Sequence, residues 1–230
     1  SVGARAEARG GAAEWGAKAP TAAAVGKSTA ATVAGTLREF GQTSAELAVA
    51  TLQRAVELCK VSSSEASKEN RRALLSAEVH EASVAAMSAH LQTSGEVQVW
   101  GASTLGHLSH GELGNKSTVC AAGAIAAIVA AMKGHRSSAS LQERGCWALR
   151  NLALGDSKRQ DAVLEAGGLV ATIVALRSHL GDAESRKALD ALPPPRVWHA
   201  AQALGAGALL ACHHRITAAS SPCCHRVTTT

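Results

Sequence analysis

Apolar positions along the middle of the chain recur with the spacing of α-helices. Leu169, Ile173 and Leu176 follow one another at steps of four and three residues, the stripe of an amphipathic helix. A longer helix is predicted from Ser138 to Ala153. The positions of this longer helix that are expected to face inward are Leu141, Gly145, Leu149 and Leu152. Helices of different length, each with one apolar face, therefore succeed one another along the chain.

This helical pattern repeats. A short helix is predicted from Lys158 to Ala166, and Gly167 ends it because glycine tolerates the left-handed conformation at a helix C-terminus. Residues 97–138 align without a gap on residues 141–182, at a spacing of 44, and another copy lies 45 residues further upstream. The matched residues include Gln98 with Gln142, Gly101 with Gly145, Val119 with Val163, Asn70 with Asn115, and His90 with His135 and His179.

The best-preserved unit resembles a known family. Its residues are the run Leu141-Gln142-Glu143-Arg144-Gly145-Cys146-Trp147-Ala148-Leu149-Arg150-Asn151-Leu152-Ala153, then Asp156, Lys158, Arg159 and Glu165-Ala166-Gly167-Gly168-Leu169. This unit is similar to an armadillo repeat of the long-period type common in protist and algal proteins. The resemblance implies an all-α fold, a right-handed α-solenoid of about three three-helix repeats, because no unit can bury its apolar face alone.

The repeat pattern divides the chain into three parts. We expect an Ala/Gly-rich leader without fixed structure at 1–41, and an irregular tail at 193–230 with a short helix at 197–212 as an alternative. Between them lies the array, 42–192. Its parts are a helix at 42–62 and units at about 65–109, 112–153 and 156–192. The chain starts at Ser1 without an initiator Met, so we expect a fragment of a longer protein.

Composition supports a helical fold and argues against some classes of partner. Alanine, the best helix former, dominates the apolar residues, while aromatic residues make up 2%. The formal charge is +5, but residues 41–182 hold 13 basic and 13 acidic residues, so we expect no nucleic-acid partner. No apolar run approaches the roughly 20 residues of a membrane helix, so no membrane insertion is expected. Six irregularly spaced cysteines favour a reducing compartment, the cytoplasm, with the nucleus or an organelle as alternatives.

The family resemblance also implies where a partner would bind. In armadillo proteins the third helices of successive units line a concave groove that accepts extended peptides. Leu149 and Leu152 point inward, so the opposite face of the helix is the candidate surface. The candidate residues are Trp100, Ser103 and His107 in one unit, and Arg144, Trp147 and Asn151 in the next.

Two of these residues are similar to a more specific pattern. Trp147 and Asn151 match the Trp and Asn ladder of the family's nuclear-import receptors, which hold basic peptides. The preceding unit has Ser103 and His107 instead, and the face lacks acidic residues. Import-type cargo binding is therefore a weaker alternative. Trp147 also fits packing between helices, and Asn151 fits a structural bond to an adjacent turn.

We expect no enzyme activity, because no nucleophile stands beside a base. No cofactor is expected: Gly26-Lys27-Ser28-Thr29 lacks the earlier glycine of a phosphate-binding loop, since position 21 is Thr. No metal site is expected, because Cys212, His213, His214, Cys223, Cys224 and His225 do not follow zinc-ligand spacing. The sequence thus favours a protein-interaction scaffold or adaptor, without a small-molecule substrate. The alternative is a regulatory arm of a larger signalling enzyme such as a kinase.

Overall fold

The computed structural model describes residues 19–26, 28–60 and 64–179, and within them the chain forms helices and no strand. The predicted all-α class is confirmed. Three predicted segments, 1–18, 180–192 and the tail 193–230 with its helix at 197–212, lie outside the described residues. The helices are α2 (Ala22–Val25), α3 (Ala30–Phe40), α4 (Ala45–Cys59), α5 (Ser64–Ser76), α6 (Val79–Ala89), α7 (Gly95–Leu108), α8 (Leu113–Ala121), α9 (Ala124–Gly134), α10 (Ala139–Ala153), α11 (Ser157–Glu165) and α12 (Gly168–Ser178).

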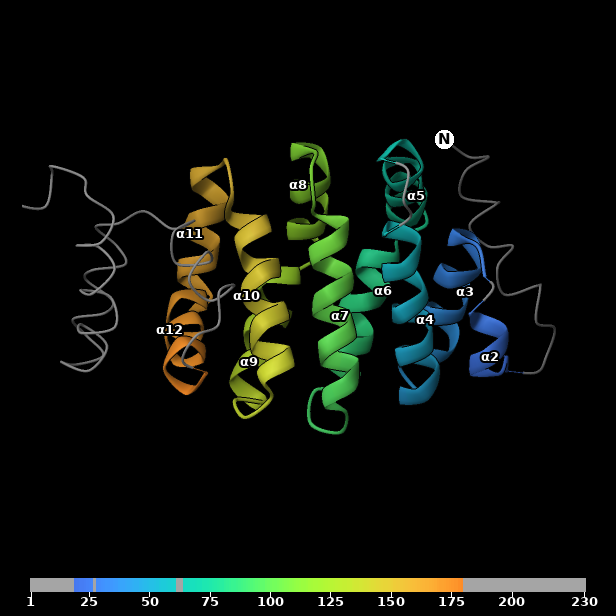
Figure 1. Ribbon diagram of the computed structural model, residues 1–230, viewed down its shortest axis with the longest axis horizontal. Coiled ribbons are helices and arrows are strands. Elements are labelled where there is room, and N and C mark those ends of the chain that lie inside the picture. Colours follow the sequence, from blue (N-terminus) through green and yellow to red (C-terminus); the bar gives the residue numbers. More distant parts are fainter. Residues whose placement is uncertain (1–18, 27, 61–63, 180–230) are drawn as a thin grey trace, which may run out of the picture.

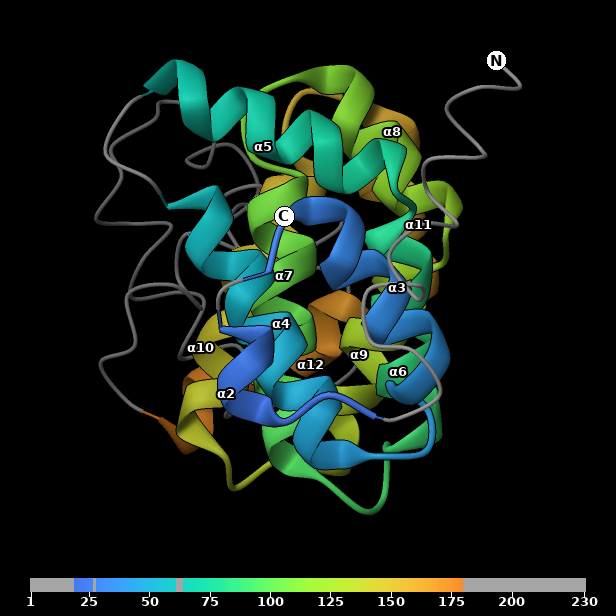
Figure 2. The same cartoon turned by 90° about the vertical axis from the view of Figure 1, so that its right-hand side faces the viewer.

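The helices stack in a repeating order. The long helices α4, α7 and α10 lie side by side in a row, and each contacts the next (Figure 1). Figure 2 shows α3, α6 and α9 in a second layer behind this row. The short helices α8 and α11, together with α5, lie along the edge where the long helices end (Figure 1). The described part of the chain is thus a helical repeat-like structure with one extended row of long helices.

Each long helix begins at a serine that caps it. The hydroxyl oxygens of Ser44, Ser94 and Ser138 accept a hydrogen bond from the backbone N–H three residues later, at 3.3 to 3.4 Å. Such a bond satisfies one of the donors that the first helical turn leaves free. The starts of the three long helices are therefore fixed locally, by the same residue type in the same place.

The repeated glycines allow close packing between two layers. A Cβ atom at Gly101 would lie 2.6 Å from the sulfur of Met87, and one at Gly145 would lie 2.6 Å from the sulfur of Met132. Both methionines are 1% exposed, so they have little room to move away. The inward positions predicted for the long helix are confirmed, because Leu141, Leu149 and Leu152 are at most 2% exposed and Gly145 is buried.

The recurring histidines link consecutive units. Each follows the last residue of its helix, and its Nε2 hydrogen-bonds a backbone carbonyl from the preceding unit. Each recurring histidine thus has a defined acceptor. The pairs are His90 with Gly41 O at 3.0 Å, His135 with Leu91 O at 2.7 Å, and His179 with Arg136 O at 3.3 Å.

The expectation of an unstructured leader at 1–41 is wrong for residues 22–25 and 30–40. These residues form α2 and α3, and α3 packs against α4 and α6. Val33 and Leu37, four residues apart, are 0% and 1% exposed. The Arg38 guanidinium donates to the carbonyl of Ala77 on the next unit. An apolar stripe on one face of α3 thus places this helix in the core, although its surroundings are rich in Ala and Gly.

Candidate functional site

The candidate residues of α7 and α10 meet at the junction of these two helices. Arg144 Nη1 donates to Ser103 Oγ at 3.3 Å. The rings of Trp147 and His107 are in tilted contact, with centroids 4.7 Å apart and planes inclined by 59°. Four of the six candidates therefore lie in one strip between α7 and α10, with Asn151 beside them near the end of α10. We call this strip the α7–α10 face.

Two of the six candidates are buried and serve the structure. Ser103 is 0% exposed and Asn151 is 4% exposed. The amide of Asn151 donates to the carbonyl of Gly106 at 3.3 Å, which ties α10 to α7. Its assignment to a ligand-facing position is therefore wrong, and the structural bond considered for it is present, although the acceptor lies in a neighbouring helix rather than a turn.

The other four candidates are half-buried and reach the surface. They are Trp100, His107, Arg144 and Trp147. Trp100 packs against the core from α7, and no direct contact joins it to the Trp147 and His107 pair. The two tryptophans are not equivalent in the repeat, because Trp100 corresponds to Arg144 and Ser103 corresponds to Trp147 at the spacing of 44.

Trp147 combines packing with partial exposure. A Cβ atom at Gly106 would lie 2.3 Å from Cζ3 of the indole, so the ring rests directly on the α7 backbone. Its remaining surface is open to solvent beside His107. The residue therefore packs between helices, as the alternative interpretation held, and still offers one aromatic face to a partner.

Cations surround the His107 ring. Burial, followed by the charges of Lys60, Arg144, His110 and Arg71, lowers the pKa of His107 to about 4. The imidazole is therefore neutral near pH 7. Every charged neighbour that acts on it is basic, although the helices that supply them are separate in the sequence.

Basic neighbours act in the same way on a second histidine, His110, which follows α7. Burial lowers the pKa of His110 most, and the charges of Arg71, Lys116 and Arg150 lower it further. We call Lys60, Arg71, Arg144 and Arg150 the cationic strip. Within the residues that the structure describes, none of the four has a carboxylate partner. Sequence reasoning missed Lys60, Arg71 and Arg150, because only folding brings them to one surface.

Two nearby cations are structural and do not belong to this strip. Lys116 Nζ donates to the carbonyl of Leu154 at 3.3 Å. Arg159 donates to the carbonyls of Leu152 at 2.8 Å and Leu154 at 3.1 Å. Both side chains belong to residues that are 7% exposed, and both satisfy carbonyls at the C-terminal end of α10.

The described residues contain no cluster of the metal-binding type. No group of three His, Cys, Asp or Glu side chains converges among them. Burial raises the pKa of the Cys59 thiol to about 12 and also raises that of Cys120, so neither supplies a thiolate at neutral pH. The cysteine and histidine residues of the tail lie outside the described part of the chain.

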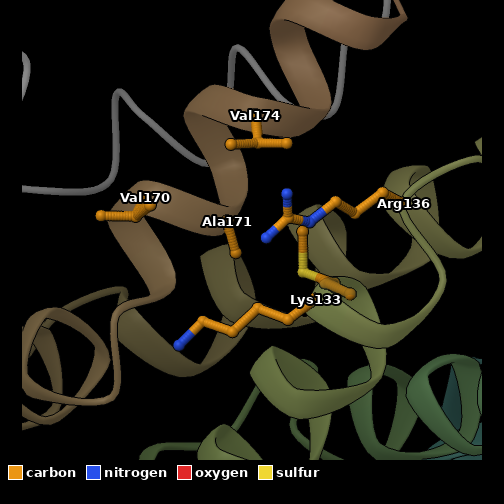
Figure 3. A pocket seen from close by; sticks show the side chains of 6 residues that line it. Lys133, Arg136, Val170, Ala171 and Val174 are labelled. Atoms are coloured by element: carbon orange, nitrogen blue, oxygen red, sulfur yellow. The ribbon is translucent and has the colours of Figure 1, made fainter. Parts of the chain in front are cut away.

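A small pocket lies on the other layer, between α9 and α12. Figure 3 shows the Arg136 guanidinium directed across it toward Ala171 and Val174. Lys133 runs along its edge and donates to the carbonyl of Ala166 at 3.3 Å. The pocket thus has an apolar wall from α12 and one engaged cation, and we find no buried polar atom that requires a ligand there.

No single helix among the described residues is long and apolar enough to cross a membrane. Only α8 and α9 taken together reach that length and apolarity, and they are bent by 67° where they join.

Comparisons with known proteins give limited likeness. No protein-family model and no curated protein matches the chain. Two crystal structures of engineered proteins from the Northeast Structural Genomics Consortium are similar. The first has 20% identity and a TM-score of 0.46, and the match covers 84% of this chain and 88% of that protein. The second has 21% identity and a TM-score of 0.40, and the match covers 82% of this chain but only 53% of that protein.

Proposed function

We propose that this chain is a protein-interaction scaffold, an α-solenoid of the armadillo type, that holds an extended segment of a partner protein against the α7–α10 face. The observation that carries the proposal is the half-buried Trp147, whose ring contacts that of His107 and which shares its face of α10 with Arg144. Tryptophan and arginine are enriched in protein interfaces and at their energetic centres. A rigid aromatic ring seated on a helix backbone loses little entropy when a partner covers it.

The row of α4, α7 and α10 supports the extended form of the ligand. Neighbouring helices present their exposed positions at regular intervals, and a peptide crossing the row meets one helix after another. The buried bonds of Asn151 and the serine caps of the long helices hold these positions fixed. Binding therefore requires little rearrangement of the scaffold.

The alternatives receive less support. Import-type cargo is a basic peptide, and the cations around His107 would repel it. No observation in the described residues favours a regulatory arm of a signalling enzyme. The scaffold proposal needs no catalytic group, and it uses the surface groups present.

The proposal can be tested with peptides selected from a random display library against the folded chain. Indole N–H signals in a proton–nitrogen correlation spectrum report the site, with assignment by Trp→Phe variants. We expect the signals of Trp147 and Trp100 to shift when a selected peptide binds. A library that yields no binder, or binders that leave both signals unmoved, would contradict the proposal.

A substitution at the face gives a second measurement. Trp147→Ala should weaken peptide binding by about tenfold, because interface tryptophans contribute on the order of 2 kcal/mol or more. Helicity by circular dichroism is measured in parallel. Glu81→Ala, at an exposed position of α6 in the second layer, is the control and should bind as the parent does. Loss of helicity in Trp147→Ala would assign this residue to the core instead.

A further inference from the structure

No member of the cationic strip forms an ion pair with a carboxylate of the described residues. Its members come from α10, from α5 and from the end of α4. Figure 1 shows that α5 and the ends of the three long helices lie toward the same edge of the row. Two acids are engaged with other arginines: Glu57 pairs with Arg54 at 3.1 Å, and Glu112 pairs with Arg72 at 2.7 Å. Glu143, next to Arg144, and Glu69, two residues before Arg71, form no ion pair with the strip within the described part of the chain.

Helix dipoles explain part of this arrangement but not all of it. A cation in the last turn of a helix is stabilised by the carbonyls there, which accounts for Lys60 after α4 and Arg150 in α10. The effect fades beyond the last turn. Arg144 lies in the first half of α10 and Arg71 lies within α5, so both require another reason. Both act on the neutral His107 ring, and bringing the two cations toward one place costs electrostatic energy because like charges repel.

The strip also differs from the structural cations next to it. Lys116 and Arg159 are buried and donate to backbone carbonyls, so their positive charge is used within the fold. Lys60 is exposed, and Arg71, Arg144 and Arg150 are half-buried, so all four reach solvent. A set of solvent-accessible cations without carboxylate partners, beside a half-buried aromatic ring, matches a ligand with carboxylates.

We propose that the segment held on the α7–α10 face is acidic, with carboxylates that pair with Arg144, Arg150, Arg71 and Lys60. This inference rests on the proposed scaffold function and specifies its partner. Packed helices lie about 8 to 10 Å apart. Three residues of extended chain span about 10 Å, so an acid at every third residue meets successive helices of the row.

The experiment uses the whole chain and synthetic peptides of about twelve residues with a fluorescent label. One peptide has Glu at every third position in a Ser, Thr and Ala background. A second peptide has Gln at those positions, and a third has Lys. Fluorescence anisotropy gives their affinities at low and at physiological salt. We expect the Glu peptide to bind at least about tenfold more tightly than the Gln peptide. Its affinity should fall as salt rises, and the Lys peptide should not bind.

Matched variants locate the binding. The site variant is Arg144→Gln with Arg150→Gln. The control is Arg136→Gln with Lys158→Gln, which removes the same charge from exposed positions on α9's end and α11. The site variant should lose about tenfold in affinity for the Glu peptide, and the control less than about twofold. Equal loss in both variants would overturn the proposed site, because net charge alone would then account for binding.

The display selection separates this inference from the scaffold proposal. Selected peptides rich in Asp and Glu that depend on Arg144 and Arg150 support both. Selected peptides without acids that still shift the Trp147 signal overturn the acidic partner and leave the scaffold standing. A selection without binders overturns the scaffold, and the acidic partner with it.

Discussion

At the scale of single residues, the repeat shows where one unit departs from its neighbours. His80 occupies the position that Ile125 and Leu169 hold in the next two units, as the second residue of α6, α9 and α12. All three side chains are buried, at 4%, 6% and 2% exposure. The Nδ1 atom of His80 is buried without a hydrogen-bond partner among the described residues. Burial of an unpaired polar atom costs free energy, so this histidine weakens the core that its apolar counterparts strengthen.

We therefore expect His80→Leu to raise the free energy of unfolding, by about 1 to 2 kcal/mol, because the unpaired nitrogen is replaced by apolar surface. Urea denaturation followed by circular dichroism measures the change. His135→Leu is the contrast, since its Nε2 bonds Leu91 O at 2.7 Å, and its loss should lower stability. A His80→Leu protein less stable than its parent would show that the ring contributes a contact worth more than the unpaired nitrogen costs.

At the scale of elements, the contacts between helices recur with small differences that can be compared directly. Gln98 in α7 donates to Met87 O at 2.9 Å, while Oε1 of the same amide is buried without a partner. Gln142 in α10 donates to Met132 O and His135 O, both at 3.0 Å. Each glutamine satisfies carbonyls at the end of the helix packed beneath it. The two residues stand at one repeat position with different numbers of bonds.

This difference predicts unequal costs for the same substitution. Gln142→Leu leaves two carbonyls without their donor and should destabilise the chain by about 1 to 3 kcal/mol. Gln98→Leu leaves one carbonyl and removes an unpaired oxygen, so its cost should be at most half as large. Chemical denaturation of the two variants and the parent, under one condition, checks the order. Equal costs, or a larger cost for Gln98→Leu, would contradict the bond assignment.

The fold could be read from the sequence wherever the period was constant. The 44-residue spacing identified α7 to α12, because Gly101 and Gly145, or His135 and His179, hold the same place in each unit. A helix at 42–62 was expected where α4 lies, but α2 and α3 were not expected, because α5 has 13 residues whereas α8 and α11 have 9. Because of this longer helix, Ser44 and Ser94 are separated by 50 residues, and a fixed offset of 44 no longer aligns α3 with α6.

The membership of α3 in the core gives its own prediction. Leu37 is 1% exposed and belongs to the hydrophobic core. Leu37→Ala should therefore lower the free energy of unfolding by about 2 to 5 kcal/mol, through lost burial and the cavity left behind. Glu39→Ala, at an exposed position of the same helix, is the control and should change stability by less than about 0.5 kcal/mol. Thermal or urea unfolding reports both. A Leu37→Ala protein as stable as its parent would show that α3 does not contribute to the core and belongs with the unstructured leader.

At the scale of the whole molecule, the zero net charge of the central region conceals an uneven distribution of its charged residues. Residues 41–182 hold equal numbers of acids and bases, which correctly disfavours a surface basic throughout. The same count cannot show that Lys60, Arg71, Arg144 and Arg150 gather on one side, since their helices are far apart in the sequence. The candidate site was predictable for Trp147 and Arg144, which share a face of one helix. Its electrostatics and the burial of Asn151 depend on neighbours that only the fold supplies.

The clustering of charge and the buried histidines also make stability depend on pH. The pKa of His107 is lowered from 6.5 to about 4, by burial and then by neighbouring cations, and burial also lowers the pKa of His80. The folded state therefore favours the neutral rings. As pH falls below about 6.5, the unfolded chain binds protons at these histidines while the folded chain does not. The free energy of unfolding therefore has its full value above that pH and declines toward about pH 4. Each ring contributes at most about 1.4 kcal/mol per pH unit, and solvent screening reduces this for the partly exposed His107. Urea midpoints should stay level from pH 7.5 to about 6.5 and then fall toward pH 5 in the parent, and fall less steeply in His80→Leu. Midpoints that stay constant over this range would show that neither ring resists protonation in the fold.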